Sequence, residues 1–338
     1  MKQYKVGLVG IGAVGTEMIK VLRQRNFPVS EIRVLATRER DEEIAGEIFH
    51  VQVASPEAFD GLDIVLFAGT EGAKGASMQY AREAVKRGCV VIDNGDDFRM
   101  DDSVPLVIPE INGDALEKHQ GLIANPNCST IITLMGIAPL HQVVPMKHMT
   151  AVTFQSVSGT GRDAVDELEQ QVQDYAAGRS SEPQVYRYPI AFNVLPQIGG
   201  PKPEMPGFTS EEAKLTFESR KILGVPDLRI ASTCVRVPVF YAHSVAVHAE
   251  FKAPMTPARA REILSAAAGV KVVDDLAAGQ YPMPITIGGG DDVGVGRIRV
   301  DPSVENGLAL WCCGDNIRKG AAQNAVQIAE ELIRRGLI

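Results

Sequence analysis

The sequence predicts an α/β protein with two domains, in which a doubly wound parallel sheet is followed by an α+β domain. Strand-like and helix-like segments alternate over residues 1–125, which is typical of parallel βαβ units. A glycine-rich turn joins the first of these strands to the first helix. From Met149 onward, longer β-rich stretches are separated by helical segments, which indicates a second, mixed sheet.

The composition is that of a large folded protein. The chain of 338 residues exceeds what one hydrophobic core usually organises, and hydrophobic residues make up 45% of it. The net charge of −8 argues against a broad nucleic-acid or anionic-membrane surface, because both need clustered Lys and Arg. No apolar run approaches the ~20 residues of a membrane span, and the N-terminal segment lacks the pattern of a signal peptide. We therefore expect a cytoplasmic protein that binds neither nucleic acid nor membranes.

The individual elements follow from short apolar runs and from apolar residues at helical spacing. The elements expected in the first domain are strands at 5–10, 32–35, 64–67 and 90–92, a helix from Thr16 and a helix at 77–87. Those expected in the second are strands at 150–156, 228–239, 244–251 and 293–300, with helices at 131–138, 162–176 and 210–223. The last segment, 316–335, is an amphipathic helix that we expect to return to the first domain. The predicted domains are residues 1–125, completed by 316–338, and residues 126–315.

The glycine-rich turn fits the pattern G-x-G-x-x-G. Gly10, Gly12, Ala13, Val14 and Gly15 lie between the first strand and the first helix, where this pattern binds dinucleotides. Glycines let the backbone approach a pyrophosphate, whose charge the helix N-terminus favours. The first domain is therefore expected to be of the Rossmann type and to bind a dinucleotide. A glycine-rich turn without a ligand is the alternative.

The end of the second strand favours NADP over NAD. An NAD site usually carries Asp or Glu about 20 residues beyond the turn, where it binds the ribose 2′-hydroxyl. This chain has Thr37, Arg38 and Arg40 in that region. A hydroxyl and guanidinium groups suit the 2′-phosphate of NADP, although a solvated charged loop would have the same composition.

One of the five cysteines differs from the others. Their odd number and scattered positions suggest neither a disulfide framework nor a zinc site, so we expect free thiols and no metal. Cys128 precedes a strongly apolar helix candidate and has polar neighbours. In the first turn of a helix, the macrodipole favours the thiolate, so Cys128 is the candidate nucleophile. The cysteines in apolar runs, which are typical of buried small hydrophobes, are Cys89, Cys234, Cys312 and Cys313.

One of the six histidines has an unusual neighbour. His243 follows Arg236 in an otherwise apolar stretch, and burying a guanidinium there is costly unless it meets an anion. The pair can place a carboxylate anchor and an acid/base group around one substrate. A surface or core histidine remains the alternative by spacing alone.

Six collinear blocks resemble aspartate-semialdehyde dehydrogenases. The similarity begins at residue 5 and continues to the C-terminal helix. The blocks are 125–130 (NPNCST), 154–159 (FQSVSG), 188–198 (YPIAFNVLPQI), 211–214 (EEAK), 233–239 (TCVRVPV) and 315–322 (DNIRKGAA).

The resemblance implies a role for each matching residue at the reacting centre. Cys128 matches the acyl-thioester nucleophile and His243 the general acid/base. Gln155 matches the glutamine that orients the substrate. Arg236 matches the cation that holds the substrate α-carboxylate, and Glu211 the acid that recognises its ammonium group.

The resemblance also implies phosphate and cofactor contacts. Arg99 and Lys214 match the phosphate-binding cations, with Asn127 close by. The residues that match contacts to the nicotinamide end of NADP are Ser158, Gly159 and Asn316.

The implied reaction is the NADPH-dependent reductive dephosphorylation of 4-phospho-L-aspartate to L-aspartate 4-semialdehyde, in lysine, threonine and methionine biosynthesis. The Cys128 thiolate would displace phosphate, and hydride transfer to the thioester would release the semialdehyde. No metal is implied. A homodimer that associates through the second domain is expected from the same resemblance.

Three departures from the family pattern bear on this prediction. The glycine turn is one residue shorter than usual. Gly95, Asp96 and Asp97 replace a Ser-Ser-Ala type segment before Arg99, which adds negative charge near the phosphate site. Ala242 stands where Gly usually precedes the catalytic His, a small change if the backbone φ there is negative.

Two alternatives accompany the main prediction. An N-acetyl-γ-glutamyl-phosphate reductase would share the Cys/His chemistry, but its substrate has no ammonium group for Glu211 to meet. A catalytically silent homologue that acts as a structural or regulatory partner would keep the fold without the activity.

Overall fold

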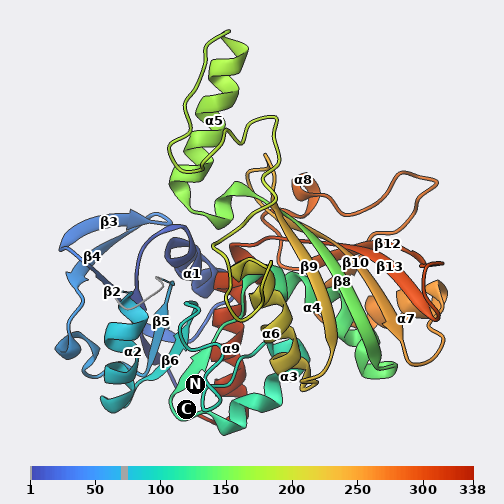
Figure 1. Ribbon diagram of the computed structural model, residues 1–338. Helices are drawn as coiled ribbons and strands as arrows, with labels where there is room; N and C mark the ends of the chain where they lie inside the picture. Colours follow the sequence, from blue (N-terminus) through green and yellow to red (C-terminus); the bar gives the residue numbers. More distant parts are fainter. Residues whose placement is uncertain (1, 70–74) are drawn as a thin grey trace. The chain divides into compact units, whose positions relative to one another are not determined.

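The chain folds into two compact units. The computed structural model describes residues 2–69 and 75–338 (Figure 1). Unit 1 comprises the residues up to Asn127 together with Ala321–Ile338, and unit 2 comprises Cys128–Gly320. The C-terminal helix belongs to unit 1, as its amphipathic pattern predicts.

Unit 1 contains the doubly wound sheet. Among the described residues its seven strands are ordered β3-β4-β2-β1-β5-β6-β7. Neighbouring strands pair in parallel except β3 and β4. The antiparallel edge hairpin of β3 and β4 is an addition that the sequence analysis did not predict. The strands are β1 (Tyr4–Val9), β2 (Val29–Ala36), β3 (Arg40–Ile44), β4 (Glu47–Val53), β5 (Ile64–Phe67), β6 (Val90–Asp93) and β7 (Leu122–Ala124).

The order of these strands reverses beside β1. β1 pairs with β2 on one side and with β5 on the other. Ligands of open α/β sheets bind at the carboxyl ends of strands where the order reverses. The glycine turn follows β1 at this end, and the Gly10 N–H donates a hydrogen bond to the Leu35 carbonyl over 2.9 Å.

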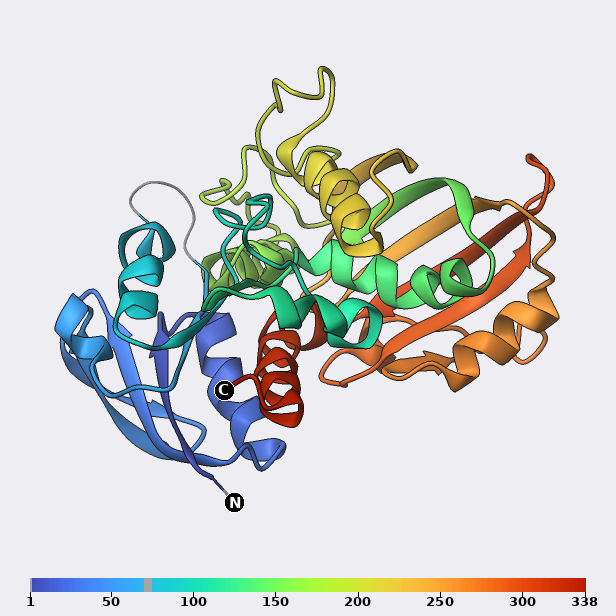
Figure 2. The same ribbon diagram turned by 90° about the horizontal axis from the view of Figure 1, so that it is seen from below.

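Helices cover the sheet of unit 1. α9 packs against α1, and the two lie side by side in Figure 2. The apolar face of α9 includes the buried Ala325, Ile328 and Leu332, which explains its amphipathic pattern. The helices and 3₁₀ turns of the unit are α1 (Ala13–Gln24), η1 (Pro56–Phe59), α2 (Ala76–Lys86), α3 (Pro109–Asn112), η2 (Gly113–Lys118) and α9 (Gln323–Arg335).

Unit 2 is built on a mixed sheet with the strand order β11-β12-β13-β10-β8-β9. β10 runs antiparallel to both β13 and β8, whereas β8 and β9 are parallel. This is the α+β unit that the sequence predicts, although β13 was not predicted as a strand. The strands are β8 (Met146–Gln155), β9 (Arg229–Arg236), β10 (His243–Phe251), β11 (Val270–Val272), β12 (Val293–Val300) and β13 (Gly307–Gly314).

Three helices cover one face of the unit 2 sheet. α4, α6 and α7 pack on it (Figure 2), and along β8 buried and half-buried side chains alternate. This pattern is typical of an antiparallel sheet with one face in the core. The helices and helical turns are α4 (Cys128–Val143), η3 (Val157–Gly159), α5 (Arg162–Ala176), α6 (Ser210–Leu223), α7 (Pro257–Ala266), α8 (Pro284–Ile287) and the π-helical turn η4 (Arg318–Ala322).

α4 lies in the core of unit 2 and is apolar on all sides, as expected for a buried helix. It approaches β13 closely, because a Cβ built on Gly136 would lie 2.2 Å from the Cys312 Sγ. Glycine at this position therefore allows the close packing. Within the described residues, no helix is long and apolar enough to cross a membrane.

Candidate active site

Cys128 is the first residue of α4 and is half-buried. The chain that follows β13 passes directly over it, since a Cβ built on Gly320 would lie 3.0 Å from the Cys128 Cβ. The position at a helix start agrees with the sequence analysis, and it is where backbone N–H groups favour a thiolate.

The other four cysteines are buried. Burial raises the pKa of Cys89 to about 11 and that of Cys234 to about 12. It also raises the pKa of Cys313 to about 11 and the pKa of Cys312 further still. These thiols are therefore poor nucleophiles near neutral pH.

His243 begins β10 and is fully buried. Its Nδ1 accepts a hydrogen bond from the Ser156 N–H over 3.0 Å. Its Nε2 has no hydrogen-bond partner among the described residues. Burial, and secondly the charge of Arg236, lower the pKa of His243 well below its usual value, so the ring is neutral at pH 7.

Arg236 ends β9, and its side chain is buried close to His243. The Arg236 Nη1 donates to the Ser156 carbonyl over 2.7 Å. A Cβ built on Gly159 would lie 3.0 Å from this Nη1 and 3.2 Å from the His243 Nε2. The guanidinium and the imidazole therefore converge on Gly159, where they leave little room for a side chain. An anionic substrate group at this position would offset the charge of the buried guanidinium.

Gln155 links the strand ends to an acidic side chain. Gln155 is the last residue of β8 and lies opposite Arg236 on β9. Its Nε2 donates to the Glu211 Oε1 over 3.2 Å. Glu211 lies in the first turn of α6, and the Lys214 Nζ is 4.0 Å from its Oε2. The structure thus brings together an amide, a carboxylate and two cations that the sequence analysis singled out separately.

The register of the sheet places these residues at one end of unit 2. His243 pairs with Gly314 at the end of β13. A Cβ built on Gly314 would lie 2.9 Å from the Ile132 Cγ1, four residues after the start of α4. The first turns of α4, which begin with Cys128, therefore lie at the end of the sheet that carries His243.

Ser158 and Asn316, predicted as cofactor contacts, belong to a buried polar network. The Asn316 Oδ1 accepts from the Ser158 Oγ over 3.2 Å and from the Ser156 Oγ over 3.1 Å. It also accepts from the Ala242 N–H over 3.0 Å. Ser156 was not predicted: its backbone N–H and its Oγ both lie 3.0 Å from the His243 Nδ1, and no residue pattern indicates a contact between residues so far apart in the sequence.

Ala242 corrects one expectation. Its substitution for glycine was judged small on the condition that φ is negative, but φ is +69°. A residue with a Cβ is strained in the left-handed region. The hydrogen bond from the Ala242 N–H to Asn316 is one of the contacts that hold it there.

The glycine turn of unit 1 has the geometry of a dinucleotide cradle. Gly10 has a φ of +93°, and a Cβ built on Gly15 would lie 2.0 Å from the Gly10 carbonyl oxygen. A Cβ on Gly12 would meet no atom within 4 Å, so the turn is open where a pyrophosphate would approach. α1 begins at Ala13, and its N-terminus favours a phosphate charge. The turn, although shorter than usual, fits a dinucleotide.

The cations predicted near this cofactor differ in their surroundings. Thr37 and Arg38 are exposed just beyond β2. Arg40 lies in β3, where its Nε donates to the Glu42 Oε2 over 2.8 Å. Arg38 is therefore the better placed of the two for a ribose 2′-phosphate.

Arg99 and Asn127, predicted near the substrate phosphate, both belong to unit 1. Arg99 is buried, and it donates to the Asn125 carbonyl over 2.9 Å and to the Asn94 carbonyl over 2.7 Å. These bonds fix the segment that leads to Asn127, which is itself buried directly before Cys128. Arg99 thus supports the backbone on the N-terminal side of the nucleophile.

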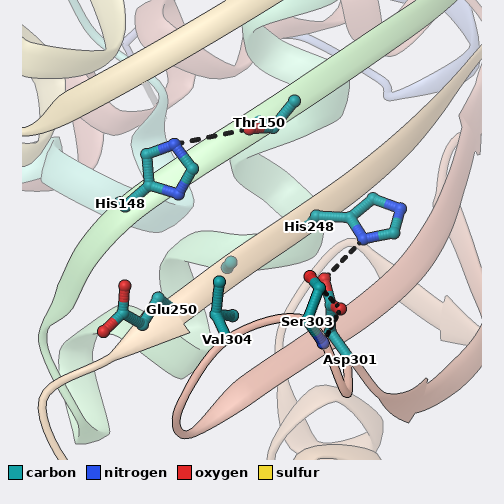
Figure 3. A pocket seen from close by; sticks show the side chains of 8 residues that line it. His148, Thr150, His248, Glu250, Asp301, Ser303 and Val304 are labelled. Carbon is teal, nitrogen blue, oxygen red and sulfur yellow. Dashed lines mark hydrogen bonds and ion pairs between the residues drawn. The ribbon is translucent and has the colours of Figure 1, made fainter.

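A separate hollow of about 190 Å³ opens on unit 2 (Figure 3). His248 lies in it with its Nδ1 2.7 Å from the Asp301 Oδ2. Hydrogen bonds from Ser303, and secondly His248, lower the pKa of Asp301 to about 2. None of the predicted site residues lines this hollow, so it is distinct from the site around His243. Its lining residues are His148, Thr150, His248, Ala249, Glu250, Asp301, Ser303 and Val304.

Comparison with known proteins covers almost the whole chain. The family model described as semialdehyde dehydrogenase, NAD binding domain, matches residues 5–119, and that described as semialdehyde dehydrogenase, dimerisation domain, matches residues 137–319. The aspartate-semialdehyde dehydrogenase of Synechocystis sp. is 46% identical over 336 residues, 98% of each chain. That of Bacillus subtilis is 41% identical over 345 residues, also 98% of each chain. The crystal structure of aspartate semialdehyde dehydrogenase II from Vibrio cholerae, complexed with ASA, has a TM-score of 0.93 at 38% identity and covers 99% of both chains.

Proposed function

The chain belongs to the aspartate-semialdehyde dehydrogenase family, and we propose that it reduces 4-phospho-L-aspartate to L-aspartate 4-semialdehyde through a thioester on Cys128. This reaction serves lysine, threonine and methionine biosynthesis. The observation that carries the proposed site is the convergence of Gln155, Arg236 and His243 at the end of the unit 2 sheet where α4 begins.

The charges of the site suit an amino-acid substrate. Arg236 is proposed to bind the α-carboxylate, for which a guanidinium offers bidentate geometry. Glu211 is proposed to bind the ammonium group, and Gln155 to orient the substrate between them. Lys214 is proposed to bind the phosphate. An acylated amine carries no charge for the Glu211 carboxylate to bind, which disfavours N-acetyl-γ-glutamyl phosphate.

Arg99 and Asn127 are also proposed to contribute to phosphate binding. Asn127 directly precedes the nucleophile, and Arg99 holds the backbone on the same side. We expect Arg99 to act partly by holding this backbone segment in place.

Replacing Lys214 should raise the KM for phosphate without changing the fold.

The cofactor proposed for unit 1 is NADP. Gly10, Gly12, Ala13, Val14 and Gly15 would hold its pyrophosphate at the N-terminus of α1. Bound NADPH supplies the hydride that reduces the thioester carbon. Thr37 and Arg38 are proposed to bind the ribose 2′-phosphate, with Ser158, Gly159 and Asn316 near the nicotinamide. A kcat/KM for NADP at least ~10-fold above that for NAD is expected, and comparable values would contradict this assignment.

Cys128 and His243 have different roles in the proposed reaction. The thiolate of Cys128 attacks the acyl carbon of the substrate, and phosphate leaves from the tetrahedral oxyanion that forms. Reduction of the thioester that remains would give a thiohemiacetal, and breaking its C–S bond releases the semialdehyde and returns the thiolate. His243 is the acid/base group of the reaction and acts at the oxygen of the carbonyl.

A homodimer is proposed through the outer face of the unit 2 sheet. Val152, Ala246 and Trp311 lie side by side on β8, β10 and β13. They are half-buried on the face opposite α4, α6 and α7. The Phe154 and Trp311 rings are 5.4 Å apart there, which extends the apolar surface that a second copy would cover.

The proposal is tested by the reverse reaction. Purified protein, aspartate semialdehyde, phosphate and NADP should give NADPH, and the rate should depend on phosphate. Without phosphate, mass spectrometry should find an acyl adduct on Cys128. Reduction of NADP only with N-acetylglutamate semialdehyde would instead identify an N-acetyl-γ-glutamyl-phosphate reductase. No reduction of NADP with either semialdehyde would identify a catalytically silent homologue.

The carboxylate site has its own test. Arg236→Lys keeps the charge but loses the bidentate fork, so the KM for the semialdehyde should rise at least ~10-fold. Unchanged kinetics would show that Arg236 does not bind the carboxylate.

A further inference from the structure

The Glu212 carboxylate joins the start of α6 to the end of β9. We infer that Glu212 is a positioning residue for the substrate, because this link sets the spacing between the Glu211 carboxylate and the Arg236 guanidinium. These two groups are proposed to bind the substrate ammonium and α-carboxylate, so the inference rests on the proposed function. The contacts of Glu212 lie within unit 2 and do not depend on that function.

The Glu212 carboxylate receives backbone N–H groups from two different elements. Its Oε2 accepts from the Thr209 N–H over 2.7 Å, and its Oε1 accepts from the Cys234 N–H over 3.1 Å. Thr209 is the N-cap of α6, whereas Cys234 lies in β9. The side chain is buried, and hydrogen bonds to an ionised carboxylate are stronger than those between neutral groups. Glu212 therefore holds the helix to the strand as well as capping the helix.

β9 requires such an acceptor because it lies at an edge of the sheet. It is the last strand in the order of unit 2, so N–H groups on its outer side need partners from outside the sheet. The Arg236 N–H donates to the Leu195 carbonyl over 2.9 Å, and the Cys234 N–H donates to Glu212. Since Cys234 is fully buried, loss of the Glu212 oxygens would leave its N–H without an acceptor.

A second bond ties the same turn of α6 to β9. The Ser232 Oγ donates to the Glu212 carbonyl over 3.2 Å. Ser232, Cys234 and Arg236 are alternate residues of one strand, so their side chains point to the same face of the sheet. All three are buried, and α6 packs against β9. Holding residues 232 and 234 against α6 therefore fixes where the Arg236 side chain leaves the strand.

Glu211 is held from the helix side. It directly precedes Glu212 in the first turn of α6, and its Oε1 accepts from the Gln155 Nε2 over 3.2 Å. A rotation or slide of this turn would move the Glu211 carboxylate relative to Arg236. The ammonium and carboxylate groups of an α-amino acid are attached to one carbon atom, so their own spacing is fixed. A displacement of about 1 Å between the groups that bind them can cost ~100-fold in rate.

Two substitutions of Glu212 test its role in substrate binding. Glu212→Met keeps the length of the side chain but lacks both oxygens. We expect it to raise the KM for aspartate semialdehyde about 10-fold, with the KM for NADP within about 2-fold and kcat within about 3-fold of the wild type. Glu212→Gln restores one acceptor oxygen, so it should recover part of the binding and raise the same KM only about 3-fold.

The matched control is Thr216→Val in the same helix. Thr216 is equally buried, and its hydroxyl donates to the Glu212 carbonyl over 3.3 Å. Its loss removes a buried hydrogen bond from α6 but leaves both oxygens of the Glu212 carboxylate in place. Thr216→Val should therefore keep all three kinetic constants within about 2-fold of the wild type.

A double-mutant cycle tests whether Glu212 acts through Glu211. Glu211→Gln removes the charge proposed to bind the ammonium group, so the spacing that Glu212 sets then matters less. In that background Glu212→Met should raise the KM for the semialdehyde about 3-fold or less, compared with about 10-fold in the wild-type background. Equal factors in the two backgrounds would show that the two residues act independently and would overturn the inference.

Amide hydrogen exchange tests the link between helix and strand without any substrate. In Glu212→Met the Cys234 amide, followed by NMR, should exchange at least ~10-fold faster than in the wild type. The Arg236 amide is the internal control, because its bond to the Leu195 carbonyl remains. An unchanged Cys234 amide would show that Glu212 does not hold β9.

The remaining outcomes separate this inference from the proposed function. If the wild-type protein lacks the phosphate-dependent reaction, the proposed function fails, whereas hydrogen exchange still reports the link. An active enzyme in which Glu212→Met leaves the KM for the semialdehyde unchanged, or raises the KM for NADP equally, contradicts the inference alone. If Glu212→Met does not fold, Ser232→Ala decides. It removes the bond to the Glu212 carbonyl and should raise the KM for the semialdehyde about 3-fold, and an unchanged KM would overturn the inference.

Discussion

At the scale of single residues, the five cysteines show how position decides reactivity. Cys128 is half-buried at a helix start, and the other four are buried with raised pKa values. We expect iodoacetamide near neutral pH to modify Cys128 first and the others only on unfolding. Cys128→Ala should fold and bind NADP but show no measurable turnover. Peptide mapping checks the site of labelling, and fast labelling of any other cysteine in the folded protein would contradict this prediction.

A second residue-scale prediction concerns the strain at Ala242. Replacing it by Gly removes about 1 kcal/mol of left-handed strain but loses a buried methyl worth about 0.8 kcal/mol and gives the unfolded chain more freedom, about 0.4–1 kcal/mol. Ala242→Gly should therefore change the free energy of unfolding by less than about 1 kcal/mol.

The control for Ala242 is a buried alanine with helical backbone. Ala213 in α6 is 1% exposed, as is Ala242, and Ala213→Gly should cost about 2 kcal/mol in helix propensity and lost burial. Urea denaturation measures both. A cost at Ala242 as large as that at Ala213 would show that the positive φ stores no strain.

At the scale of the elements, two glycines of one turn have separable tasks. A Cβ on Gly15 would meet the Gly10 carbonyl oxygen at 2.0 Å, whereas a Cβ on Gly12 would meet nothing within 4 Å. We expect Gly12→Ala to keep the melting temperature and to lose NADP affinity, because the new methyl occupies the space of the pyrophosphate. Gly15→Ala should lower both. Calorimetric melting and titration distinguish the two, and normal NADP binding by Gly12→Ala would place the cofactor elsewhere.

The elements that could be predicted from the sequence are those with local signals. α6 spans Ser210–Leu223, as predicted, because Thr209 and Glu212 form a capping box and Gly224 ends the helix in the left-handed conformation. β13 was missed because its residues form a continuous apolar run, in which strand and buried helix have the same pattern.

The candidate site also combines features that have a local sequence signal with features that have none. Cys128 at a helix start and the glycine turn are local features, and both were recognisable from the sequence. The network of Ser156, Asn316 and Ala242 joins residues up to 160 positions apart. It depends on backbone donors and on one positive φ, so no sequence pattern could reveal it.

At the scale of the whole molecule, the proposed dimer interface on the outer face of the unit 2 sheet predicts that a charged side chain placed there prevents dimerisation. Ala246 lies between Val152 and Trp311 on neighbouring strands, so a carboxylate there would be buried in an apolar interface. We expect Ala246→Asp to sediment as a monomer. Ala258→Asp, on the exposed side of α7, is the matched control and should remain dimeric. Sedimentation velocity decides, and a dimeric Ala246→Asp protein would place the interface on another surface.

The close approach of Cys128 and Gly320 bears on whether unit 2 can be removed from the chain or exchanged. These two residues are the ends of unit 2, and in unit 1 the Asn125 Nδ2 lies 3.4 Å from the Ala321 carbonyl oxygen. Unit 2 is thus an insertion whose entry and exit adjoin, the arrangement that tolerates grafting of one domain into another. Residues 1–127 joined to 321–338 by a short Gly-Ser linker should fold and bind NADP, as circular dichroism and titration would show, and an unfolded product would contradict this. Recombination at these two points would therefore exchange unit 2 while the hydrogen bonds within unit 1 stay in place.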